Sequence, residues 1–262
     1  MGDRKMIAKD NERTSEGGHW YCRETGAPMY TIVGKNGKER NTTLRDARAL
    51  NLVPSVSGVI KMMHSEGLLQ WMLNEMLMSA LTLPKIEGES LTIFAERVKH
   101  DSKETSRKAM QKGTDIHTSL QKHFEGKFNV EHPNHVKAVV NALNNHFGER
   151  PWESEQKMPN GKFGYGGKTD LIDYLGNGIV VDFKSKDTND IDKMIAFDAQ
   201  GMQLSAYRMG FNVPKARCAN VYVSVNEPVI VKVIEWREEE LQRCWGMFQA
   251  CLRLWQLKNN YE

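Results

Sequence analysis

The sequence predicts an α/β protein in which a helical front half precedes a back half that combines strands with helices. From residue 54 to residue 147, apolar residues recur at helical spacing between capping and turn residues. From residue 152, short apolar runs alternate with turn residues, as strands do. Helical spacing returns at 190–210 and 238–257. A central mixed sheet flanked by helices, with an N-terminal helical subdomain, accounts for this order.

The front half begins with a polar segment. Residues 1–18 carry few apolar side chains and are expected to form a loosely held leader. A strand is expected at residues 30–33, followed by a Gly-rich hairpin turn. Ser55 follows a proline and precedes an apolar run, so we expect it to cap a helix that begins at Val56.

Longer helices complete the front half. We expect them at residues 68–83, 90–125 and 133–147. The first of them is rich in methionine. Met72–Met78, with Trp71 and Phe94, is expected to lie in the core, because methionine fills irregular gaps between packed side chains.

The back half supplies the sheet. Strands are expected at 152–158, 163–174, 178–184, 217–225 and 229–236. The turn Gly176–Gly178 joins the second and third of these strands into a hairpin. We therefore divide the chain into a leader (1–18), an N-terminal hairpin and helical subdomain (19–150) and an α/β core (151–262).

Composition excludes several classes of protein. The net charge of +3 permits binding to a polyanion without requiring it. The four cysteines form no CxxC pair, which indicates a reducing compartment rather than a disulfide framework. Without a signal peptide or a long apolar run, the expected location is the cytoplasm, with no membrane partner.

Two acidic residues and a lysine fall on the two strands of the predicted hairpin. Asp182 lies in an apolar run, where an unpaired carboxylate would be costly to bury. Side chains alternate along a strand, so Asp182 and Lys184 share one face while Val181 and Phe183 share the other. Asp170 lies on the preceding strand. Two carboxylates and an amine in one place suit Mg²⁺ or Mn²⁺ and the hydrolysis of a phosphodiester.

Further polar residues accompany this set. Gln203 and Tyr207 are four residues apart on a predicted helix and share its face. His117 follows several cations on an earlier helix, and Glu155 precedes the first aspartate strand. Simpler explanations remain open at this stage: a surface ion pair, an ordinary helical histidine, and helix packing by Gln203 and Tyr207.

The ordered set of His117, Gly167–Asp170, Asp182–Lys184 and Gln203–Tyr207 resembles the RecB-like branch of the PD-(D/E)XK nuclease superfamily. The likeness spans about residues 113–210, and it is closest to the stand-alone exonucleases of phages and mitochondria. It implies a core like that of restriction endonucleases and a metal-dependent DNA exonuclease. The metal ligands that it implies are Asp170, Asp182, the carbonyl of Phe183 and His117.

The resemblance also implies roles for the other residues. Lys184 positions or activates the attacking water and stabilises developing charge. Gln203 and Tyr207 contact DNA or support Lys184, and Glu155 is a possible additional carboxylate near the metal. The implied substrate is DNA that is single-stranded or has free ends. A recombination or replication protein is a possible partner, and host cytoplasm is the expected location if a phage encodes the chain.

Basic residues precede His117 on its helix. Arg107, Lys108 and Lys112 could contact nucleic-acid phosphates, or they could form an ordinary solvated face. Three outcomes are weighed for the whole chain: an exonuclease, a structure-specific endonuclease, and a catalytically silent nucleic-acid-binding protein. No residue excludes RNA as the substrate.

Two other cofactors are not expected. Gly167-Lys168-Thr169 resembles the end of a phosphate-binding loop, but Lys162 stands where the first glycine should be and a strand follows instead of a helix. ATP is therefore not expected. Some members of the RecB-like branch hold an iron–sulfur cluster with four cysteines, but the cysteines here lack the close spacing of such a cluster.

Overall fold

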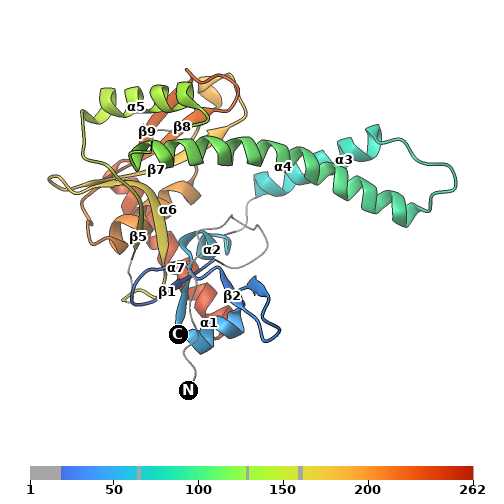
Figure 1. The fold of residues 1–262 in the computed structure, drawn as a ribbon, viewed down its shortest axis with the longest axis horizontal. Coiled ribbons are helices and arrows are strands. Elements are labelled where there is room, and N and C mark those ends of the chain that lie inside the picture. The colour runs from blue at the N-terminus through green and yellow to red at the C-terminus, as the bar shows by residue number, and fades with distance from the viewer. Residues whose placement is uncertain (1–18, 64–65, 128–129, 159–161, 262) are drawn as a thin grey trace.

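The computed structural model describes residues 19–63, 66–127, 130–158 and 162–261 (Figure 1). The predicted leader, residues 1–18, lies outside the described residues. The centre of the molecule is a five-stranded sheet. Its strands are β5 (Glu153–Met158), β6 (Gly167–Asp173), β7 (Ile179–Lys186), β8 (Arg217–Ser224) and β9 (Val231–Glu235), and they lie side by side in that order.

The sheet is mixed, which confirms the predicted fold class. β7 and β8 are parallel, and the other neighbouring strands are antiparallel. A parallel pair needs a crossover connection, and here α6 (Asp198–Gly210) lies in that connection. β6 and β7 form the predicted hairpin around Gly176 and Gly178, both of which have positive φ.

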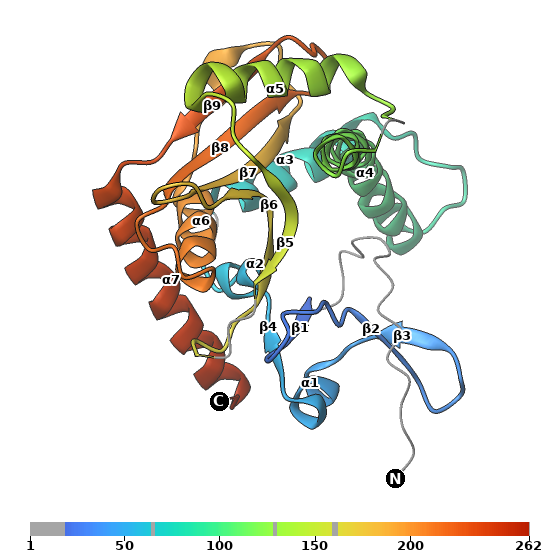
Figure 2. The same cartoon turned by 60° about the vertical axis from the view of Figure 1, so that its left-hand side comes forward.

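Helices cover both faces of the sheet (Figure 2). On one face, α6, α7 (Glu238–Asn259) and the short α2 (Val56–Ile60) enclose a core that includes Val180. On the other face, α4 (Leu91–Phe124) and α5 (Pro133–Phe147) enclose a second core that includes Val181. Two adjacent valines thus belong to different cores, as the alternation of a strand requires.

A smaller N-terminal region packs beside the body. β1 (Trp20–Cys22) pairs with β4 (Leu52–Pro54), and β2 (Thr31–Val33) pairs with β3 (Glu39–Asn41). α1 (Leu44–Leu50) connects these pairs. Trp20 and Leu52 share a third core cluster with Tyr261, which follows α7, so both ends of the described chain meet there.

The predicted helix start at Ser55 is confirmed. The Ser55 hydroxyl accepts a hydrogen bond from the backbone N–H of Gly58 at 3.0 Å, the geometry of a helix cap. The prediction of one helix over 190–210 is wrong in its first part. A single 3₁₀ turn (Ile191–Lys193) comes first, and α6 begins only at Asp198, because the Gln200 side chain caps the N–H of Phe197.

The Met-rich segment is not in the core, which corrects the prediction for Trp71 and Met72–Met78. α3 (Glu66–Thr82) and the first half of α4 form an antiparallel hairpin that extends from the body, and we call residues 66–107 the helical arm (Figure 1). Trp71 is 45% exposed and Met72 is 50% exposed. Phe94 is half-buried. One neighbouring helix cannot bury a helix whose apolar residues extend around most of its surface.

Candidate active site

Asp170 and Asp182 meet where β6 and β7 separate. Leu171 and Val181 form the last pair of the ladder, and one further step in register places the two aspartates opposite each other. The backbone N–H of Phe183 instead donates to Asp170 Oδ2 at 2.7 Å. Asp170 is 8% exposed and Asp182 is 3% exposed. Two like charges directly opposite each other are unfavourable, so other groups must stabilise this pair.

Lys184 is one such group. Its Nζ lies 2.6 Å from Asp182 Oδ2 and donates to Gln203 Oε1 at 3.1 Å. Gln203 Nε2 donates to the Tyr207 hydroxyl at 3.0 Å. The contact between Gln203 and Tyr207 follows from their spacing on α6. The structure therefore brings together Asp170, Asp182, Lys184, Gln203 and Tyr207.

Burial governs the protonation of this group. Burial raises the pKa of Asp182, and Asp170 raises it further, while Lys184 opposes both. Burial also raises the pKa of Tyr207 far above its ordinary value, so the side chain is a neutral phenol. Two carboxylates against one nearby ammonium leave a site that attracts a cation.

His117 reaches the same place from α4. Its Nε2 lies 2.9 Å from the carbonyl oxygen of Phe183, and its Nδ1 lies 3.8 Å from Asp170 Oδ1. A carbonyl oxygen only accepts, so Nε2 carries the proton and Nδ1 faces the carboxylate. His117 therefore joins the site from α4, which covers the face of the sheet opposite to α6.

Sequence reasoning missed two residues behind Asp182. Asn220 Nδ2 donates to Asp182 Oδ2 at 2.9 Å, and Trp236 Nε1 donates to Asn220 Oδ1 at 2.8 Å. Asn220 is fully buried on β8, beside Asp182 in the parallel register. Its place as a polar residue within an apolar strand was a usable signal, because a buried amide needs partners.

Tyr222 shares the face of Asn220 on β8 and is opposite Lys184 in register. It is fully buried, and its hydroxyl has no hydrogen-bond partner among the described residues. Burial and the neighbouring Asp182 raise its pKa. The site thus has a neutral hydroxyl beside its carboxylates that no motif in the sequence had indicated.

The remaining predicted residues are Glu155 on β5 and three basic residues on α4. Glu155 forms an ion pair with Lys168 and has a positive φ of 54°, which is rare for a residue other than glycine. Its neighbours Ser154 and Gln156 pair with Leu171 and Thr169, so Glu155 lies opposite Asp170 in the register of β5 and β6. Arg107 and Lys112 are exposed on α4, and the side chain of Lys108 is outside the described part of the chain.

The residue types fit a divalent cation. Oδ1 of Asp170 and Oδ1 of Asp182 accept no hydrogen bond from the described residues, and hard oxygen ligands suit Mg²⁺ or Mn²⁺. These residues do not by themselves complete the coordination of a metal ion. Within the described ranges, no three His, Cys, Asp or Glu side chains are grouped as metal ligands. His117 would add its Nδ1, which already faces Asp170 Oδ1 at 3.8 Å.

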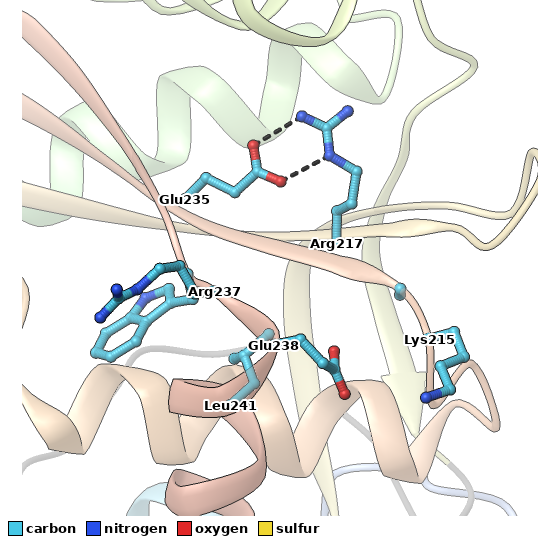
Figure 3. Close-up of a pocket in the computed structure, with 8 residues that line it drawn as sticks. Lys215, Arg217, Glu235, Arg237, Glu238 and Leu241 are labelled. Atoms are coloured by element: carbon cyan, nitrogen blue, oxygen red, sulfur yellow. Dashed lines mark hydrogen bonds and ion pairs between the residues drawn. The ribbon is translucent and has the colours of Figure 1, made fainter.

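A separate hollow of about 470 Å³ lies where β8 begins and α7 starts (Figure 3). Its charges are mostly paired with each other. Arg217 makes two 2.7 Å hydrogen bonds to Glu235, and Glu238 pairs with the buried Arg208 at 2.7 Å. The residues that line this hollow do not include Asp170, Asp182 or Lys184, so it is a different site from the aspartates.

Comparisons with known proteins give structural likenesses alone. No family model matches the sequence, and no curated protein matches it. Among solved structures, an alkaline exonuclease (LHK-Exo) from Laribacter hongkongensis is 13% identical, with a TM-score of 0.37 over 78% of this chain and 91% of that chain. The protein SSO0001 is 15% identical, with a TM-score of 0.31 over 71% of this chain and 88% of that chain.

A protein from Eubacterium rectale is 13% identical, with a TM-score of 0.40 over 58% of this chain and 69% of that chain. All three TM-scores are below 0.5, so these likenesses carry no argument about the function of this chain. Across the described part of the chain, no helix combines the length and the apolar character needed to cross a membrane.

Proposed function

We propose that the protein is a metal-dependent nuclease that hydrolyses phosphodiester bonds of DNA from strand ends or on single strands. The observation that supports this proposal is the arrangement of two buried carboxylates from adjacent strands with the amine of Lys184 at 2.6 Å from one of them. Proteins use such carboxylates to hold Mg²⁺ or Mn²⁺. An amine beside them stabilises negative charge as it develops on phosphate.

Asp170 and Asp182 are the proposed metal ligands, with the carbonyl of Phe183 and the Nδ1 of His117 as further ligands. A cation held by these residues would lower the pKa of a coordinated water and neutralise charge on a phosphate oxygen. The backbone N–H of Phe183 and the amide of Asn220 each hold one oxygen of these aspartates and so orient the other oxygen.

Lys184 is the proposed charge-stabilising residue. An ammonium has three N–H donors, and Asp182 and Gln203 take two of them. The third can reach a phosphate oxygen or the attacking water. Gln203 is held in turn by Tyr207, so these two residues position the lysine. Arg107, Lys108 and Lys112 on α4 are proposed contacts to the nucleic-acid backbone, where each cation neutralises a phosphate.

Linear and circular single-stranded DNA test this proposal, each with Mg²⁺ or Mn²⁺. We expect the wild-type protein to degrade the linear strand and leave the circle intact. We expect Lys184→Ala to lose cleavage by at least about a hundredfold while it still binds DNA, since a lost charge-stabilising group costs that much. Lys186→Ala, two residues further along β7, is the matched control and should remain active.

Other outcomes assign the protein differently. Cleavage of the circle would indicate the structure-specific endonuclease, and matched RNA strands test for a ribonuclease. Metal-independent binding without cleavage of any strand would indicate a nucleic-acid-binding protein. Full activity of Lys184→Ala would refute the proposed role of Lys184.

A further inference from the structure

The helical arm exposes a large apolar surface. Eight large apolar side chains of α3 are exposed among the residues that the structure describes. Leu73, Leu77 and Met78 are 49%, 57% and 57% exposed. Soluble monomers rarely expose apolar patches of more than a few hundred Å² unless the patch binds something.

α3 presents its faces in the reverse of the usual arrangement for a surface helix. Of the α3 side chains that the structure describes, only Ser79 is buried, and Glu75, one turn earlier, is half-buried. α3 therefore turns a narrow polar face to the protein and its apolar faces outward, whereas amphipathic helices normally do the opposite. Packing within one chain does not explain this sequence.

The arm has a defined shape rather than a loose one. Arg97 on α4 bonds both carboxylate oxygens of Glu89 at 2.9 and 2.8 Å and also donates to the carbonyl of Pro84. These contacts fasten the connection between α3 and α4 onto α4. A fixed helical hairpin presents the same apolar surface in every copy of the chain.

The negative charge of α3 argues against partners that carry phosphate groups. Residues 62–84 contain two glutamates and no lysine or arginine. Such a segment repels phosphates, so neither a nucleic acid nor an anionic lipid surface suits it. The partner must be apolar and must match a two-helix hairpin.

We propose that the helical arm is a dimerisation surface, and that its partner is the arm of a second copy of this chain. Two hairpins packed together form a four-helix bundle, in which each helix has two adjacent partners rather than one. A symmetric pair uses the same patch on both subunits, which satisfies both arms at once. Such a bundle buries the faces of α3 that one chain leaves exposed.

The available area matches this partner. Eight large apolar side chains of α3, between 38% and 72% exposed, form a patch on the order of several hundred Å². A standard interface buries about 800 Å² on each partner. The exposed apolar residues Leu91 and Ile93 on α4 extend the surface in the same hairpin. The patch is therefore comparable in size to one side of such an interface.

Light scattering after gel filtration tests the proposal on the full chain from about 1 to 100 µM, the weak end of affinities for an interface of this size. The wild-type protein should have twice the monomer mass of 29.9 kDa. Leu73→Glu and Leu77→Glu, measured separately, should each have the monomer mass. Both side chains are already exposed in one chain, so neither change should unfold it, and circular dichroism checks this.

Leu257→Glu is the matched control, because Leu257 is an equally apolar residue, 61% exposed, on α7. It should remain a dimer. A wild-type monomer throughout this concentration range would overturn the proposal, even if the monomer then bound neutral lipid vesicles. Dimers that survive both folded arm variants would also overturn it, because they would place the interface elsewhere.

Discussion

Asn220 connects the proposed metal ligands to the rest of the protein. Its amide donates to Asp182 and accepts from Trp236, so one side chain fixes the carboxylate relative to the strand after it. Both of its polar groups are used and buried. A buried hydrogen-bonded chain of this kind restricts a side chain to one orientation, which a ligand residue requires.

Asn220→Ala should therefore lower both stability and metal binding. The change leaves Asp182 with one donor fewer and leaves Trp236 Nε1 without its acceptor. We expect the free energy of unfolding to fall by about 1–3 kcal/mol in urea, the cost of unpaired buried polar groups. Calorimetric titration with Mn²⁺ should show weaker binding. Asn226→Ala is the control, because the side chain of Asn226 is exposed. Equal unfolding free energy and equal Mn²⁺ affinity for Asn220→Ala and wild type would contradict the proposed role of Asn220.

Sequence reasoning found the residues that follow a pattern and missed those that do not. Asp182 and Lys184 are two apart on a strand, and Gln203 and Tyr207 are four apart on a helix, so periodicity alone predicts that each pair shares a face. Asn220 contacts Asp182 because β8 pairs with β7, and Trp236, which follows β9, contacts Asn220. Such contacts between distant segments depend on strand order, which no local pattern contains.

At the scale of elements, close contact between β6 and α6 holds the carboxylates near Gln203. Gly167 begins β6, and a Cβ there would lie 2.6 Å from Tyr207 Cε1 and 3.3 Å from Val56 Cγ2. The absence of a side chain thus lets the Tyr207 ring rest on the strand. The same ring carries the hydroxyl that holds Gln203.

Gly167→Ala should separate these elements. We expect a loss of about 1–3 kcal/mol in stability, the usual cost of overpacking a core, and a lower rate of cleavage as Tyr207 moves. Gly246→Ala is the control, because a Cβ there meets no atom within 4 Å on α7, and alanine in a helix adds about 0.5–1 kcal/mol. Thermal unfolding of both variants distinguishes crowding from a general effect of removing glycine. A wild-type melting temperature for Gly167→Ala would contradict the prediction that a Cβ at this position displaces Tyr207.

At the scale of elements, too, local features were predictable from the sequence and contacts between distant segments were not. Ser55 caps α2 through a contact three residues away, which the sequence predicts. The exposure of α3 was not predictable, because methionines and leucines at helical spacing describe a buried helix equally well. Only the three-dimensional arrangement shows that α3 packs against α4 on a hairpin that leaves the body (Figure 1).

At the scale of the whole molecule, the N-terminal region is joined to the last helix. The Tyr261 hydroxyl lies 3.1 Å from the carbonyl oxygen of Ala47 and also contacts the carbonyl oxygen of Leu52. Its ring packs against Trp20 and Trp255. A residue beyond α7 therefore stabilises α1 and the strand pair of β1 with β4, which lie more than 200 residues earlier in the chain.

Tyr261→Phe removes the hydroxyl but keeps the ring in the cluster. The two carbonyl oxygens then lose a buried donor, so we expect the free energy of unfolding to fall by about 1–2 kcal/mol. Hydrogen exchange should accelerate first in β1 and β4, because the loss is local to that region, while the amides of β7 and β8 stay protected. Tyr174→Phe is the control, since Tyr174 is 46% exposed and its hydroxyl is not needed for packing. Unchanged exchange in β1 and β4 would show that the aromatic cluster alone holds the N-terminal region in place.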